Sequence, residues 1–139
     1  MTDSQHIIDR LNSHREQFLE DMGCVIRDVD VEQRSCTMEF NIDQRYCHSG
    51  DVIQGGFVTA MLDAVASHAV FLANPKTKVV ATLELKVTFF EVSRRGQLTA
   101  VGKVDKMTRS IAFVSADLFD PNGVLTASLS STAKLIIAD

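Results

Sequence analysis

The stretch from Gly55 to about Ala73 constrains the fold of this chain more than any other feature. Its residues are apolar around the whole helical circumference, with alanines between larger side chains that include Phe57, Val58, Met61, Leu62, Val65, Val70, Phe71 and Leu72. A helix that is apolar on every side is a buried helix, and Asn74-Pro75 supplies its stop signal. The rest of the chain must therefore wrap around this helix.

Hydrophobic alternation with a period of two predicts strands on both sides of that helix. The expected strands cover residues 24–31 and 35–42 before it, and 82–89, 97–104, 110–118 and 124–136 after it. Residues 43–54 are expected to form a loop, and residues 4–21 an amphipathic helix. Short turns between consecutive strands indicate one antiparallel sheet. We therefore expect one α+β domain over residues 1–139, with an antiparallel sheet wrapped around one long buried helix and an N-terminal helix within residues 1–22.

Composition narrows the classes of function. With 139 residues and 45% hydrophobic content the chain suits a single core, and its formal net charge of −4 argues against nucleic acid as a partner. The N-terminus lacks a basic segment followed by an apolar stretch, so we expect no signal peptide, and no apolar run suits a membrane span. Cys24, Cys36 and Cys47 are an odd number without metal-ligand spacing, which indicates reduced thiols in a cytoplasmic protein.

Polar residues interrupt the apolar helix on one stripe. Thr59, Asp63 and Ser67 are four residues apart and so share a helix face, whereas His68 lies on a different face and is expected to pack or to sit at an interface. An isolated buried carboxylate is costly and must find partners. Either Asp63 bonds to Thr59, to neighbouring backbone or to water, or it is a nucleophile or general base in a dry cleft.

Gln54-Gly55-Gly56 stands at the start of the same helix. The first N–H groups of a helix lack internal partners and carry partial positive charge, so a carbonyl placed there would be polarised. The alternative is that the glycines only form a tight turn. Gly55 and Asp63 are eight residues apart, about 12 Å along the axis, so one carbonyl cannot touch both within one chain. If both act, two antiparallel helices from two subunits must share the site.

The segment from His48 to Asp63 resembles the signature of the PaaI-like hotdog-fold acyl-CoA thioesterases, in a Gln-Gly-Gly variant. That signature is Asn-Pro-x-Gly-x-x-His-Gly-Gly, with an aspartate in a Leu-Asp pair eight residues after its first glycine. The resemblance continues through residues 82–90 and 109–113 and covers most of the chain from about residue 20. It implies the hotdog fold, hydrolysis of CoA thioesters without a metal or redox cofactor, and a homodimer or a dimer of dimers.

The resemblance also implies roles for single residues. Asp63 would attack the thioester or activate water, the Gly55 N–H would polarise the carbonyl, and Thr82 would help to hold the water. Gln54 replaces the usual histidine but can still donate from its amide, and His48 stands where an asparagine is usual and could position water. Gly56 is expected to contact the substrate, and Arg109 and Ser110 to contact the phosphate and pantetheine part of CoA. Apart from the resemblance, Phe89 and Phe90 are neighbours on a strand, so one of them is expected in the core and the other along the acyl or pantetheine passage.

Two other functions compete with thioester hydrolysis. A hotdog dehydratase or hydratase would use a loop histidine and a helix carboxylate as its acid and base. His48 and Asp63 could form this pair, although the loop lacks the Pro-Gly helix start that is usual in those enzymes. A non-catalytic acyl-CoA binding module is the other alternative. Basic residues in the late turns form either ordinary surface charge or a clamp for CoA phosphates: Arg94, Arg95, Lys103, Lys106 and Arg109.

Overall fold

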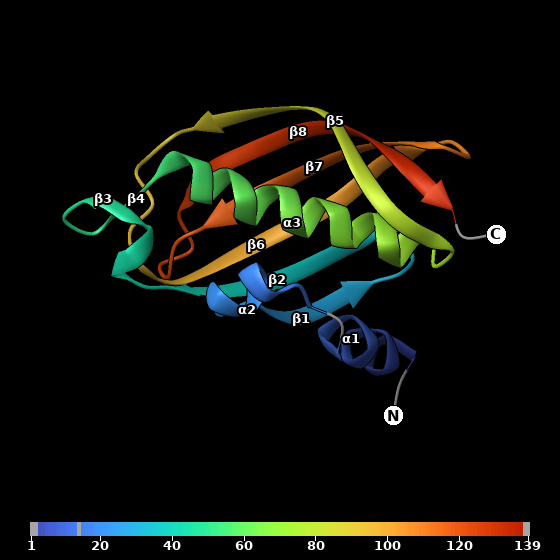
Figure 1. Ribbon diagram of the computed structural model, residues 1–139, viewed down its shortest axis with the longest axis horizontal. Helices are drawn as coiled ribbons and strands as arrows, with labels where there is room; N and C mark the ends of the chain where they lie inside the picture. The colour runs from blue at the N-terminus through green and yellow to red at the C-terminus, as the bar shows by residue number, and fades with distance from the viewer. Residues whose placement is uncertain (1–2, 14, 138–139) are drawn as a thin grey trace.

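The computed structural model describes residues 3–13 and 15–137, and these fold around one long helix, α3 (Gly55–Ala73) (Figure 1). A six-stranded antiparallel sheet has the order β1-β2-β6-β7-β8-β5. Its strands are β1 (Val25–Asp30), β2 (Ser35–Ile42), β6 (Gly96–Met107), β7 (Ile111–Phe119), β8 (Leu125–Ile137) and β5 (Thr77–Phe89). The predicted antiparallel sheet around a long central helix is confirmed, including both ends of the helix.

Gly102 of β6 determines how closely α3 can approach the sheet. A Cβ at this position would lie 2.5 Å from the carbonyl oxygen of Val65, so the helix backbone rests directly on the strand. Side chains on the inner face of the sheet surround this contact and are fully buried, among them Met38, Phe40 and Leu98. The core is therefore built from the inner face of the sheet and the face of α3 that turns toward it.

The opposite face of α3 is only partly covered. Phe57 is 39% exposed, and Thr59, Asp63 and Ser67 are half-buried. By length and composition α3 could cross a membrane, but 56% of its apolar window is buried in the protein, as for a core helix. One apolar face of α3 thus packs against the sheet, and the opposite face is incompletely covered.

The N-terminal segment differs from the expected single helix over 4–21. It contains two helices, α1 (Asp3–Ser13) and α2 (Gln17–Asp21). The Asn12 carboxamide pairs with the backbone of Ile26, accepting from its N–H at 3.0 Å and donating to its carbonyl at 3.2 Å. Arg15 donates to the carbonyl of Cys24 at 2.7 Å. These bonds tie the end of α1 and Arg15 to the backbone of Cys24 and Ile26.

Two further elements differ from the sequence prediction. Residues 43–54 contain a short 3-10 helix, η1 (Gln44–Tyr46), and a small hairpin of β3 (Cys47–Ser49) and β4 (Val52–Ile53), which lies at the N-terminal end of α3 (Figure 1). β5 begins at Thr77, not at 82, because Val79, Val80 and Ala81 are consecutive apolar residues and do not show the alternation that predicts a strand.

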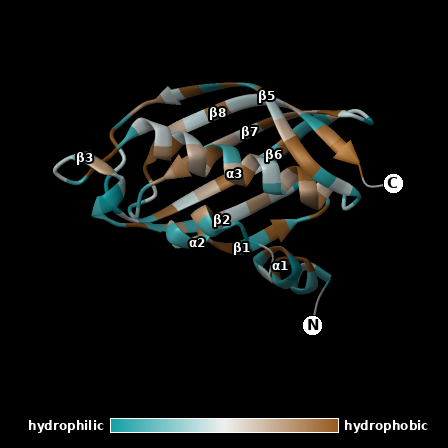
Figure 2. Ribbon diagram, viewed as in Figure 1, coloured by the Kyte–Doolittle hydropathy of each residue, from teal (hydrophilic) through white to brown (hydrophobic). Residues whose placement is uncertain are grey.

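β5 forms one edge of the sheet and exposes apolar side chains. Leu83 is 58% exposed, Leu85 40% and Phe89 51%. Figure 2 shows apolar stretches along both β5 and α3. An edge strand presents unpaired backbone groups that can pair with another strand, so this edge and the open face of α3 both lack a cover within one protomer.

Candidate active site

Asp63 lies on the incompletely covered face of α3 and contacts β5. The Thr82 hydroxyl donates to Asp63 Oδ1 at 3.0 Å, and the strand irregularity that follows Thr82 belongs to the same part of β5. The Thr59 hydroxyl bonds instead to the carbonyl of Gly55, one turn back, at 2.9 Å. Thr59 was one of the possible partners of Asp63, but the two residues do not bond to each other.

A cavity of about 280 Å³ adjoins Asp63. α3 contributes one wall and α2 the other, where Phe18 and Leu19 face the helix. Ala60, Ala64 and Phe71 supply the apolar part of the α3 wall, beside Asp63, Ser67 and His68. A carboxylate at the edge of an apolar cavity is placed to act on a ligand that fills the cavity.

The start of α3 leaves one backbone donor free. Gln54 Oε1 accepts from the Gly56 N–H at 2.7 Å, and the Gln54 carbonyl accepts from Phe57 and Val58 at 2.9 and 3.3 Å. Within the described part of the chain, the Gly55 N–H has no hydrogen-bond partner. Because the helix dipole adds partial positive charge at this end, Gly55 is the donor best placed to bind a carbonyl oxygen.

The glycine at position 56 allows the side chain of Gln54 to cap the helix. A Cβ at Gly56 would lie 2.7 Å from Gln54 Oε1, which is too close. The cap uses only the carbonyl oxygen of Gln54, so its amide nitrogen remains available as a donor. The helix start therefore offers two kinds of donor, a backbone N–H and a side-chain amide.

A second cavity, of about 450 Å³, adjoins Gly55. His48 and Phe90 line it, and a Cβ on Gly55 would lie 3.4 Å from the ring of Phe89. His48 is exposed, and its Nδ1 lies 2.8 Å from the Ser49 hydroxyl. The structure thus brings Gly55, His48, Phe89 and Phe90 together at one cavity. Both phenylalanines are exposed, so the expectation that one of them lies in the core is wrong.

The two cavities have no lining residue in common, so Asp63 and Gly55 of one chain border separate spaces. Thr82 belongs with Asp63, to which it bonds. Arg109 and Ser110 line neither cavity. They are exposed in the turn from β6 to β7, at the end of α3 opposite Gly55 (Figure 1).

Two features near Asp63 escaped the sequence analysis. The α2 wall did so because a single helix over 4–21 gave no reason to place Phe18 beside α3. His68 is buried and packs against Phe71, in line with the expected packing role, and it also lines the Asp63 cavity, which the sequence did not indicate. Its Nδ1 lies 2.7 Å from the Ala64 carbonyl, so Nδ1 carries the proton. Burial lowers the pKa of the His68 imidazole, against smaller raising effects of Ala64 and Glu16, so the ring is neutral near pH 7.

The buried thiols do not suit nucleophilic chemistry. Burial raises the pKa of the Cys24 thiol to about 12 and has the same effect on Cys36. The thiolate is the reactive form, so both side chains are inert at neutral pH. Asp63 is therefore the stronger candidate for a nucleophile or base.

Comparison with known proteins assigns the family. Residues 50–127, more than half of the chain and including Gly55, Asp63 and Thr82, match the model of the thioesterase superfamily. The chain therefore belongs to the thioesterase superfamily, and the class of reaction is hydrolysis of a thioester. Among curated relatives, a provisionally named esterase of Saccharolobus solfataricus is 26% identical over 102 residues (73% of this chain, 72% of the relative). One of Sulfurisphaera tokodaii is 25% identical over 129 residues (93% and 94%).

Solved structures show the same fold. A phenylacetic acid degradation-related protein of Ralstonia eutropha, described provisionally as a thioesterase, has a TM-score of 0.84 at 24% identity, over 92% of this chain and 98% of that one. The PaaI protein of the E. coli phenylacetic acid degradation operon has a TM-score of 0.83 at 12% identity, over 97% and 96%. The predicted PaaI-like hotdog fold is confirmed.

Proposed function

We propose that this protein hydrolyses acyl- or aryl-CoA thioesters to a free acid and CoA, at a site completed by a second copy of the chain. The proposal rests on one observation. A single helix, α3, holds a carboxylate, Asp63, and a free backbone donor, the Gly55 N–H, but the two groups adjoin separate cavities. Antiparallel packing of two α3 helices would place Asp63 of each copy opposite the Gly55 of the other, which supports two complete sites per dimer.

In each site the Gly55 N–H donates to the thioester oxygen and stabilises the oxyanion that forms on attack. Asp63 acts in one of two ways. As a base it takes a proton from water, whose oxygen attacks the carbonyl carbon; as a nucleophile it attacks that carbon itself, and water then hydrolyses the anhydride. In both routes the carbon–sulfur bond breaks and CoA leaves as a thiolate that takes up a proton. Thr82 holds Oδ1 of Asp63 and leaves Oδ2 to act.

The other residues bind and orient the substrate. The amide nitrogen of Gln54 donates to the thioester, and the exposed His48 positions water. Gly56 allows the Gln54 cap, and Phe89 and Phe90 line the passage for the acyl or pantetheine part. Two further residues, Arg109 and Ser110, would contact the CoA phosphate. Their turn lies at the C-terminal end of α3, about 15 Å along the axis beyond Asp63 and the Gly55 of the other copy, so the distant phosphate end of an extended CoA would have to reach it.

The edge strand β5 supports a homodimer. Pairing of two β5 edges would continue the sheet and cover Leu83 and Leu85; a dimer of dimers would need a further interface. We place the enzyme in the cytoplasm, which suits the unpaired, buried Cys24 and Cys36. The proposed chemistry uses only protein groups and water and requires no metal or redox cofactor.

The test is release of free CoA from octanoyl-CoA and benzoyl-CoA by wild type and by Asp63→Asn. We expect the variant to lose at least about 100-fold in kcat while keeping its circular dichroism spectrum and melting temperature. Asp105→Asn, which changes an exposed acid of β6 that bonds to Ser115, is the matched control. Near-normal turnover by Asp63→Asn would contradict the mechanism. Loss of water from 3-hydroxyoctanoyl-CoA to give the enoyl-CoA, without CoA release, would favour a dehydratase.

A further inference from the structure

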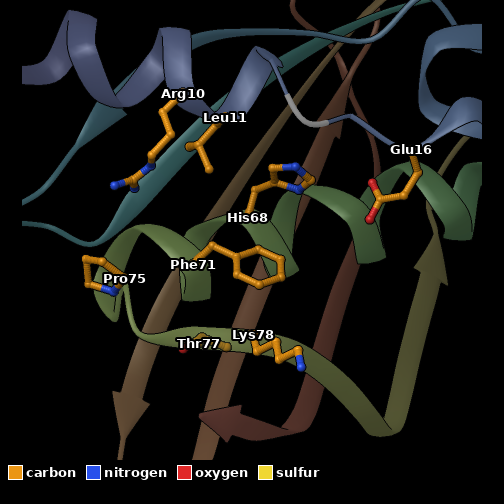
Figure 3. Close-up of a pocket in the computed structure, with 8 residues that line it drawn as sticks. All are labelled: Arg10, Leu11, Glu16, His68, Phe71, Pro75, Thr77 and Lys78. Atoms are coloured by element: carbon orange, nitrogen blue, oxygen red, sulfur yellow. The ribbon is translucent and has the colours of Figure 1, made fainter. Parts of the chain in front are cut away.

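A third cavity, of about 330 Å³, continues the Asp63 cavity along the C-terminal half of α3. Three residues line both cavities: Glu16, His68 and Phe71. Figure 3 shows Phe71 and His68 on α3 between α1, which carries Arg10, and the beginning of β5, which carries Lys78. A ligand bound beside Asp63 therefore has room to extend past Phe71 toward α1 and β5.

The chemistry of the wall changes along this path. Beside Asp63 the wall is mostly apolar, with Phe18 and Leu19 opposite Ala60 and Ala64. His68 marks the transition; it is neutral, and its ring meets the ring of Phe71 edge to face at 6.0 Å between centroids. Beyond it Arg10, Thr77 and Lys78 add polar groups to a wall that also contains Leu11 and Pro75. The path thus suits a ligand with an apolar middle and a polar end.

Positive charge prevails at the far end. Arg10 and Lys78 are exposed, and neither side chain has an ion pair or hydrogen bond among residues 3–13 and 15–137. Glu16 is the one acid in this lining, so two cations face one anion. Thr77 is only 8% exposed, and its buried hydroxyl has no partner, which is unfavourable for a buried polar group. Cations without partners beside an unsatisfied hydroxyl suit an anionic ligand group.

The length of the path limits the ligand. Asp63 and Phe71 are eight residues apart on α3, about 12 Å along the axis. An acyl chain of medium length is needed to reach from the reacting carbonyl to the cations. A two- or three-carbon acyl group would end in the apolar part beside Asp63.

We propose that the preferred acyl group carries a carboxylate at its far end, so that the substrate is the CoA monothioester of a medium-chain dicarboxylic acid. The methylene chain lies against Phe71, and the terminal carboxylate accepts hydrogen bonds from Arg10 and Lys78. This inference rests on the proposed thioesterase function and adds the substrate class.

The test compares suberoyl-CoA with octanoyl-CoA, which have equally long chains and differ in the terminal carboxylate. Wild type should prefer suberoyl-CoA in kcat/KM. The double variant Arg10→Ala/Lys78→Ala should lose about 10- to 100-fold on suberoyl-CoA, mainly through KM, and stay within about twofold on octanoyl-CoA. Lys76→Ala, an exposed lysine outside the cavity lining, is the matched control and should change neither.

Two outcomes would overturn the substrate class. Wild type could use octanoyl-CoA as well as suberoyl-CoA, or the double variant could lose equally on both, which would mean that the cations serve the CoA phosphates. Calorimetric binding of free suberate against octanoate gives a readout that needs no turnover. If wild type binds suberate and the double variant does not, the carboxylate site is supported. If wild type also hydrolyses neither thioester, that failure counts against the proposed function and not against the site.

Discussion

The Thr82 hydroxyl and the Asp63 carboxylate lie 3.0 Å apart and join strand β5 to helix α3. The two residues are 19 positions apart in the sequence, and no other side-chain hydrogen bond of Asp63 is found in the described part of the chain. The bond fixes one carboxylate oxygen, so the orientation of the other is set by a residue of the edge strand. We therefore propose that Thr82 positions Asp63.

Replacing Thr82 by valine tests this role, because valine keeps the shape and the strand preference of threonine but cannot donate. A hydrogen bond to a charged group contributes more than a neutral one, so kcat should fall about tenfold while KM and the melting temperature stay nearly constant. Thr88→Val, an exposed threonine on the same strand, should leave kcat unchanged. Equal kcat values for the two variants would show that the bond does not position Asp63.

Much of the fold was predictable because it follows from local patterns. The all-round apolarity of residues 55–73 and the Asn74-Pro75 stop gave both ends of α3, and alternation gave all six strands of the main sheet. The break between α1 and α2 was not predictable, since it depends on bonds from Asn12 and Arg15 to the backbone of distant residues. The helical spacing of apolar residues continues through this break, so the sequence pattern predicted one helix over 4–21.

The same distinction applies to the site. The separation of Gly55 from Asp63 follows from helix geometry and could be derived from their spacing. The contact between Thr82 and Asp63 is tertiary, and it was expected only through the family resemblance. The cavity beside Asp63 was not foreseen, because it depends on where α2 docks and brings Phe18.

The contact of Gly102 with α3 gives a prediction for stability. A methyl group at this position would lie 2.5 Å from the Val65 carbonyl oxygen, and backbone on both sides leaves little room to relax. Gly102→Ala should lower the free energy of unfolding by about 1–3 kcal/mol, as overpacking does. Urea unfolding should show a lower midpoint at an unchanged slope. Lys103→Ala, at the next and exposed position, should shift stability by less than about 0.5 kcal/mol; a similar shift for both would mean that the sheet moves away without strain.

The free N–H of Gly55 can be removed without disturbing the helix. Gly55 is the first residue of α3, a position that favours proline, and Gln54 has φ −63° and ψ 136°, as a residue before proline requires. Gly55→Pro should reduce kcat by about 10²- to 10³-fold, the usual effect of losing an oxyanion donor. Gly55→Ala adds a carbon near Phe89 but keeps the N–H, and should retain most of the activity. If the two variants were equally impaired, steric hindrance and not the missing donor would be the cause.

A heterodimer of two inactive chains distinguishes a shared site from a site within one chain. One chain carries Asp63→Asn and the other Gly55→Pro, with different affinity tags, and the mixed dimer is isolated through both tags. In a shared arrangement one site combines the intact Asp63 of one chain with the intact Gly55 of the other, and the second site carries both lesions. The mixed dimer should then recover about half of the wild-type CoA release. In an arrangement confined to single chains each site keeps one lesion, and the mixed dimer should be as inactive as its parents.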